Sequence, residues 1–203
     1  MDTNTFPTKG NLMKAKATLA MSKMGYDLID KKRNVLVKEI LELNEKAEKI
    51  QHEIAVTFRE AYLALQEANI SMGINNVRAI SHGMPEEDSL SVRARSIMGV
   101  EIPNIRYEEK PMSLNYGFLN TTTDFDVAVE KFNRVKYLTI ELSMVETATY
   151  RLAISIKKTQ RRANALKNIT IPNYEGLAKE ISSTLEERER DEFTRLKVLK
   201  KKK

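Results

Sequence analysis

The sequence contains no cysteine and no tryptophan, and it is poor in glycine, proline and aromatic residues. Without cysteine the chain can form no disulfide, no thiolate nucleophile and no cysteine-ligated zinc or iron–sulfur site. Only 7 of the 203 residues are glycine and 5 are proline, whereas sandwiches, barrels and doubly wound sheets need frequent turns built from these residues. Their scarcity argues against such folds and favours long helices.

Signatures of catalysis and metal binding are also missing. The sequence contains none of the motifs GxxxxGK[ST], GxGxxG, HExxH and GxSxG. Its only histidines, His52 and His82, are too few for a histidine-rich metal centre. We therefore expect a protein that is not an enzyme by itself, with no catalytic residue, no metal site and no cofactor.

The chain lacks any apolar run close to the roughly 18 residues of a membrane span. Residues 1–7 also lack the apolar stretch of a secretory signal. The net charge of +6 is a mild basicity that suits nucleic acid, an anionic membrane surface or an acidic protein. These features predict a cytoplasmic protein without direct membrane insertion.

The positions of glycine and proline divide the chain into two long arms and a turn-rich middle. Seven of these residues lie in 73–123, whereas one interrupts 11–72 and two, Pro172 and Gly176, lie in 124–203. Residues 8–72 are predicted to form one long helix and residues 124–198 a second, broken near 172–176. In the segment 73–123, the β-branched runs on either side of Gly99 predict a short β-hairpin.

A heptad repeat of apolar residues, called the seam below, runs through both arms. In the first arm its positions are Leu12, Ala15, Leu19, Ser22, Tyr26, Ile29, Arg33, Leu36, Ile40, Leu43, Ala47, Ile50, Ile54, Thr57, Ala61, Ala64 and Ala68. In the second arm they are Ala128, Lys131, Val135, Leu138, Leu142, Val145, Thr149, Leu152, Ile156, Thr159, Ala163 and Leu166. A pattern sustained over this length is typical of a coiled coil.

Because the arms are similar in length, they are predicted to fold back on each other, with position i facing about 196 − i. The predicted fold class is all-α: a long antiparallel, left-handed two-helix coiled coil that forms a single elongated domain over residues 1–203. The heptads alone are equally compatible with an intermolecular dimer.

Basic residues gather in two stretches of the arms. Residues 3–26 contain four lysines and residues 151–167 contain six basic residues, and neither stretch contains an acidic residue. The antiparallel pairing places the second stretch beside residues 29–45, which begin with Lys31, Lys32 and Arg33. This concentration of charge predicts either a contact surface for an acidic partner or a solubilising face.

Six segments of the chain form a recognisable set: PTKGNL at 7–12, GYDLIDKKRNVLV at 25–37, RSIMGV at 95–100, RRANAL at 161–166, IP at 171–172 and LEERER at 185–190. Together they resemble the D subunit of the vacuolar- and archaeal-type rotary ATPases, in the form expected of a bacterial member. The resemblance covers nearly the whole chain, and the segment 25–37 is its most specific part.

This resemblance implies a non-catalytic central rotor shaft that couples ATP hydrolysis or synthesis to proton or sodium transport. The implied partners are the catalytic and regulatory subunits of the ATPase hexamer, the small F subunit of the central stalk, and the funnel-like C (or d) subunit above the membrane rotor ring. The complex would hold the protein at the membrane periphery. From positions along the predicted coiled coil, we expect the hexamer to contact Lys9, Lys14, Lys31, Lys32, Arg33, Arg161 and Arg162. We expect the small stalk subunit to contact Ala61, Ala64, Ala68, Val135 and Leu138.

The residues alone leave two other functions open. A basic coiled coil can bind nucleic acid, but the sequence shows no recognised reading module and no basic face interleaved with aromatic residues, so we expect no nucleic-acid partner. A helical hairpin or a dimeric coiled coil can also serve as a scaffold.

Overall fold

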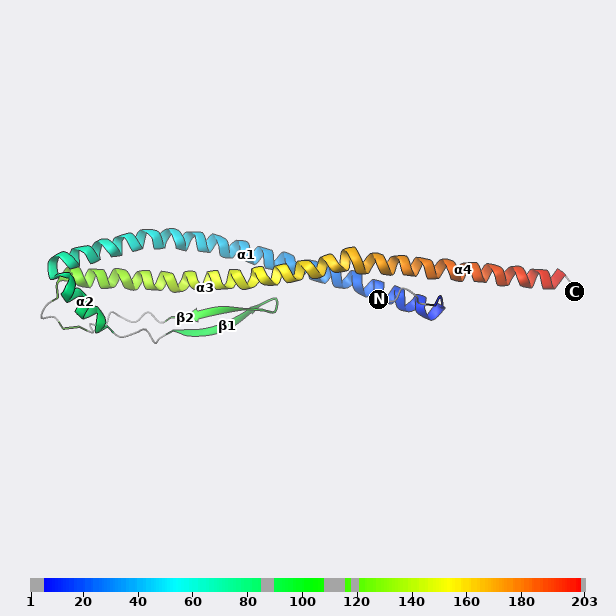
Figure 1. The fold of residues 1–203 in the computed structure, drawn as a ribbon, viewed down its shortest axis with the longest axis horizontal. Coiled ribbons are helices and arrows are strands. Elements are labelled where there is room, and N and C mark those ends of the chain that lie inside the picture. The colour runs from blue at the N-terminus through cyan, green and yellow to red at the C-terminus, as the bar shows by residue number, and fades with distance from the viewer. Residues whose placement is uncertain (1–5, 85–89, 108–115, 118–120, 202–203) are drawn as a thin grey trace. The chain divides into compact units, whose positions relative to one another are not determined.

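The computed structural model describes residues 6–84, 90–107, 116–117 and 121–201 (Figure 1). Along the chain it contains α1 (Lys9–Met72), α2 (Ile74–His82), β1 (Ser91–Ile97), β2 (Val100–Arg106), α3 (Thr123–Ala165), the π-helix η2 (Leu166–Thr170) and α4 (Ile171–Lys201). The chain is therefore mostly helical, with long helices in both arms and one small hairpin between them. The first helix, predicted over 8–72, is confirmed to within one residue at each end, and the short hairpin predicted around Gly99 is confirmed.

The chain divides into two compact units. The hairpin unit comprises Leu36–Ser155, and the terminal unit comprises the residues up to Val35 together with those from Ile156 onward. In both units the predicted seam is confirmed, because all seventeen seam positions of α1 and all twelve of α3 and η2 are buried or half-buried. Every buried residue of α1 lies on the seam, so the heptad repeat identifies its core face.

In the hairpin unit, α1 and α3 pair in antiparallel fashion. The ring of Tyr62 meets Phe132 edge to face, with 5.7 Å between ring centroids, close to the facing position of about 134 that the antiparallel pairing predicts. The ion pair between Arg134 and Glu53, at 2.7 Å, also joins the two helices. Leu36 and Leu152 are fully buried seam residues of this unit.

In the hairpin unit, residues of α1, α2 and α3 form a small apolar cluster where α1 ends and α3 begins. Gly73 ends α1 with φ +83°, a left-handed conformation that favours glycine and lets the chain turn into α2. Val77 of α2 packs with Ala68 and Phe125 in this cluster. Tyr116 adds an edge-to-face contact with Phe125 at 5.0 Å.

The β-hairpin contains seven residues in each strand, paired from Ser91 opposite Arg106 to Ile97 opposite Val100. Its turn residues, Met98 and Gly99, both have positive φ, at 50° and 76°. Two positive φ values define a type I′ turn, whose twist matches that of the flanking strands. Ile102, at 7% exposure, is the buried residue of the hairpin.

In the terminal unit, the start of α1 pairs with the end of α3, with η2 and with α4. The Lys23 ammonium lies 2.6 Å from the Glu175 carboxylate, and the Lys167 ammonium lies 6.0 Å from the centroid of the Tyr26 ring. These contacts place Gly25 opposite the irregular part of the second arm, as the antiparallel pairing predicts.

The predicted break near 172–176 is wrong in both place and form. Pro172 and Gly176 both lie inside α4, and the irregularity is η2, directly before it. Pro172 has no N–H to donate to the helix ladder, and the π-helix η2, with its wider hydrogen-bond spacing, lies just before it. The Ile171 N–H bonds to the carbonyl of Leu166, five residues back instead of four.

The π-helix shifts the seam by one residue. Up to Leu166 the seam follows the heptad, and beyond η2 it continues through buried or half-buried Ile171, Tyr174, Ala178, Ile181 and Leu185. The step from Leu166 to Ile171 is five residues, where a heptad would take four. η2 therefore accommodates one extra residue and keeps the apolar stripe of α4 on the buried side.

Candidate functional site

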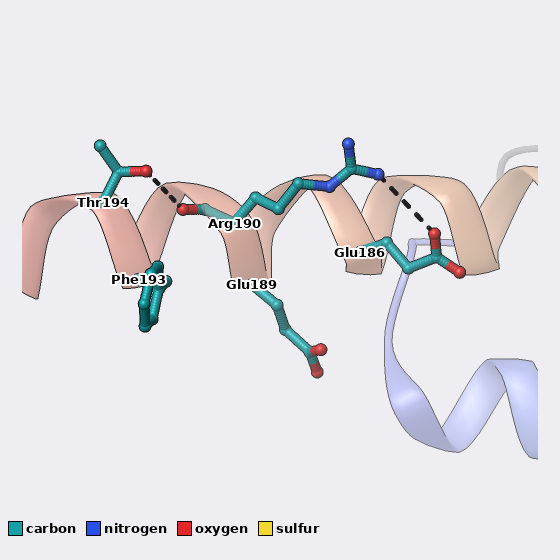
Figure 2. A pocket seen from close by; sticks show the side chains of 5 residues that line it. All are labelled: Glu186, Glu189, Arg190, Phe193 and Thr194. Atoms are coloured by element: carbon teal, nitrogen blue, oxygen red, sulfur yellow. Dashed lines mark hydrogen bonds and ion pairs between the residues drawn. The ribbon is translucent and has the colours of Figure 1, made fainter.

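Among the described residues we searched for a metal site and for a ligand pocket. These residues contain no group of three or more His, Asp or Glu side chains that could hold a metal ion. A depression of about 470 Å³ is lined by Glu186, Glu189, Arg190, Phe193 and Thr194. Figure 2 draws these five side chains along α4. All five come from α4 and are exposed, so the depression lacks the converging walls of a ligand pocket. No helix among residues 6–84 and 121–201 is long and apolar enough to span a membrane.

An exposed apolar face of α1 is the most distinctive surface of the terminal unit. Met13, Met21, Met24 and Leu28 are 61–72% exposed, and we call these four residues the methionine face. Relative to the seam they occupy the outward heptad positions, which a solvated coiled coil fills with polar residues. Neighbouring apolar side chains left exposed in this way form a candidate contact surface for another protein.

The methionine face is a surface that was not predicted from the sequence. The available signal was the methionine and leucine residues at the outward positions of a heptad whose inward positions were already apolar. A helix that is apolar on two sides needs a second partner beyond its own helix pair.

Five of the seven basic residues expected at the hexamer extend into solvent. Lys14 and Lys31 are exposed on α1, at the same outward heptad positions as the methionine face. Arg161 and Arg162 are exposed on α3, and Lys32 is half-exposed. None of these five residues forms an ion pair with another described residue. They provide positive charge in the same unit as the methionine face.

The other two expected basic residues, Lys9 and Arg33, are engaged within the terminal unit. Lys9 forms an ion pair with Glu189 at 2.9 Å, and the hydrogen bond and charge of Glu189 raise the pKa of Lys9. Arg33 is half-buried on the seam and donates a hydrogen bond to Gln160 at 2.8 Å. Arg33 therefore stabilises the helix pair, and its guanidinium is largely unavailable to a partner.

The five residues expected to contact the small stalk subunit require a correction. Ala61, Ala64, Ala68, Val135 and Leu138 are at most 5% exposed. Their side chains form the core of the hairpin unit because they lie on the seams of both helices. A partner at this level would meet the exposed side chains beside them instead.

Comparisons with known proteins identify the family of the chain. The family model for the ATP synthase D subunit matches residues 11–201. The D subunit of the V-type ATP synthase of Thermotoga neapolitana is 41% identical over 196 residues, which cover 97% of each chain. The D subunit of the A-type ATP synthase of Pyrococcus abyssi is 36% identical over 197 residues, covering 96% of this chain and 92% of the relative.

The family match and the relatives both extend over nearly the whole chain, including both long helices and the hairpin. They agree with the segments at 7–12, 25–37 and 161–166 that carry the resemblance in the sequence. The chain belongs to the D-subunit family of the V-type and A-type ATP synthases.

Proposed function

We propose that this chain is the central rotor shaft of a V/A-type rotary ATPase. In this function it couples ATP hydrolysis or synthesis in a catalytic hexamer to ion translocation through a membrane ring, and it performs no catalysis itself. The observation that carries the proposal is the seam, which remains buried or half-buried from Ala15 to Ala68 in a chain of the D-subunit family. Torque transmission requires two long helices that cannot slip past each other, and a continuous seam with cross-helix ion pairs meets that requirement.

The terminal unit is the part that we assign to the hexamer. Apolar contact is non-directional, so the methionine face can turn against a surrounding surface without settling in one hydrogen-bonded orientation. Lys14, Lys31, Arg161 and Arg162 supply positive charge that attracts an acidic sleeve.

A single shaft can place three equivalent catalytic interfaces in different states. Its faces differ, because the methionine face is apolar whereas the exposed surface of α3 bears Arg161 and Arg162. Each interface therefore meets a different part of the shaft surface at a given rotation angle. Contacts that differ from one interface to the next shift the conformational equilibrium of each catalytic interface to a different extent.

The hairpin unit is the part that we assign to the remaining partners. We place the small F subunit of the central stalk beside the exposed Tyr62, Leu63 and Tyr137, which adjoin the buried residues of the helix pair. We place the funnel-like C subunit at the end of the helix pair, where Ile70 and Ile74 are 85% and 68% exposed. This arrangement keeps the chain at the periphery of the membrane.

Purification of the tagged chain from its own cells tests the assignment. We expect one copy per hexameric ATPase, recovered with a small stalk subunit and with ATPase activity. Recovery of a bare dimer, or of the chain bound to nucleic acid, would contradict it. The dimeric coiled coil is the weaker alternative because the seam of α1 is already buried by the chain's own second arm.

Charge reversal tests the contact with the hexamer. Replacing Lys31, Lys32, Arg161 and Arg162 by Glu is expected to leave ATP hydrolysis running while ion transport falls. Reversal of Lys46, Lys49 and Arg59, exposed bases of the hairpin unit, is the matched control. Equal coupling ratios in the two variants would refute the proposed role of the terminal charges.

A further inference from the structure

The β-hairpin has one sheet edge that contacts α3 and one whose outward backbone groups bond to no other described residue. We call the second edge the free edge. On the outer side of β2, the Ile105 N–H lies 3.4 Å from Met144 Sδ, and the Glu101 carbonyl accepts a hydrogen bond from Arg151 at 3.1 Å. Pro103, between them, has no N–H to offer. The outer edge of β2 therefore faces side chains of α3, and β1 forms the opposite edge.

The strand register shows which groups lie on the free edge. Residues paired across an antiparallel ladder alternate between bonding each other and pointing their N–H and C=O groups outward. On β2, the outward backbone groups belong to Glu101, Pro103 and Ile105. On β1, the backbone groups of their ladder partners therefore also point outward, and these partners are Ser96, Ala94 and Val92. These three β1 residues are exposed, and no backbone hydrogen bond joins their outward groups to another described residue.

Arginines alternate with these outward-pointing groups. Arg93 and Arg95 of β1 share one face of the hairpin with Arg106 of β2, since residues two apart on a strand point to the same side. All three side chains are exposed, and no carboxylate of the described residues forms an ion pair with any of them. The free edge is therefore flanked by positive charge.

We propose that β1 is a docking edge for an extended, acidic segment of another protein. The segment would add to the hairpin as a third strand, through the backbone groups of Val92, Ala94 and Ser96. Carboxylates at alternate positions of the segment would face Arg93 and Arg95. This inference does not depend on the rotor assignment, because it follows from the hairpin alone.

The charge of the edge decides between possible occupants. Pairing β1 with β1 of a second copy would bring arginines of the two chains close together, and like charges on neighbouring strands are destabilising. An acidic strand turns the same arginines into attractive partners. If the arginines served only to discourage edge-to-edge association, β1 would bind neither a second copy of itself nor an acidic strand.

The test uses the full chain and a capped eight-residue peptide in which Glu alternates with Val. We expect the peptide to bind and to slow hydrogen exchange at the N–H groups of Val92, Ala94 and Ser96, but not at those of Arg93 and Arg95. Replacing both arginines by Gln should weaken binding about fivefold to tenfold. The control variant, Arg59→Gln with Arg78→Gln, removes two exposed arginines outside the hairpin and should bind normally.

A second pair of variants isolates the backbone contribution. Ala94→Pro removes an outward N–H that takes no part in the hairpin's own ladder, so the hairpin should persist while peptide binding is lost. Ala94→Thr keeps that N–H and should bind as the parent does. The proposal is overturned if the peptide does not bind, if it binds without slowing exchange, or if a peptide with Lys in place of Glu binds equally. A chain that is dimeric through β1 would overturn it as well.

Discussion

Arg33 Nη1 donates a 2.8 Å hydrogen bond to Oε1 of Gln160, a residue 127 positions further along the chain. The same guanidinium forms an ion pair at 2.6 Å with Asp30, one turn earlier on α1. A charged residue at a seam position is thus held by partners on both arms of the terminal unit. Polar residues at such positions can define the register of a helix pair at some cost in stability.

Replacing Arg33 by Ala should destabilise the fold by about 1–2 kcal/mol, because the hydrogen bond to Gln160 and the ion pair to Asp30 are lost without compensation. Arg33→Leu should be closer to neutral, since Leu restores apolar burial at a seam position. Urea denaturation of both variants measures the difference, with Lys38→Ala as an exposed control. Equal losses for Ala and Leu would contradict this account of Arg33.

Leu36 is fully buried, whereas Leu41 on the same helix is 58% exposed. Leu36→Ala should therefore cost about 2–5 kcal/mol through lost burial and a residual cavity. The matched change Leu41→Ala should cost less than about 0.5 kcal/mol. Thermal and urea unfolding of the two variants test the seam assignment, and similar costs at both positions would show that it is wrong.

Because η2 contains one residue more than the heptad requires, deleting a residue there and inserting one should have different effects on stability. Deleting Ile169, which is 60% exposed, should turn η2 into α-helix while Ile171 and Ala178 stay on the seam, because the spacing from Leu166 then returns to the heptad. Inserting one Ala after Asn168 should instead rotate α4 away from α1 and destabilise the terminal unit. Circular dichroism during thermal unfolding compares the two. Equal destabilisation by deletion and insertion would exclude this origin of the π-helix.

Tyr116 OH donates a 2.6 Å hydrogen bond to Oδ1 of Asp126. Burial, together with the hydrogen bond and the charge of Asp126, raises the pKa of Tyr116 to about 12 from its usual 10.0. The raised pKa means that the folded state holds the phenol proton more tightly than the unfolded state. Stability from this group is therefore complete below pH 10 and is lost as the pH rises toward 12.

Tyr116→Phe should cost about 1 kcal/mol at neutral pH, since one hydrogen bond is removed. It should also remove one tyrosinate step near pH 12 from the ultraviolet absorbance titration of the folded chain. The parent chain supplies the reference curve. If the variant instead lacks a titration step near pH 10, Asp126 does not raise the pKa of Tyr116.

The long helices and their core faces were predictable from the sequence because both follow from local spacing. Few glycines and prolines permit a helix from Lys9 to Met72, and the heptad identifies the buried side. The hairpin was equally local, since β-branched runs flank a Met98–Gly99 turn. These features require no knowledge of which segments of the chain meet.

The candidate surfaces were less predictable, because exposure depends on the partner helix. Arg33 and Lys14 are both basic residues of the first arm, yet Gln160 engages Arg33 in the seam while Lys14 stays exposed. Ala61 and Ala64 were expected to contact the small stalk subunit, but both are buried in the helix pair. Only the structure of the paired helices shows which of these side chains are exposed and which are buried or engaged.

Local spacing in the sequence predicted the type of each element, the seam and the approximate facing of the two arms, because periodicity and backbone preference act over a few residues. The tertiary structure decided which basic residues stay exposed, the one-residue shift at η2, and which edge of the hairpin contacts α3. Those properties arise only when residues far apart in the chain come into contact, such as Lys23 with Glu175 or Ile105 with Met144. The energies of these contacts depend on distances between residues that no local sequence pattern specifies.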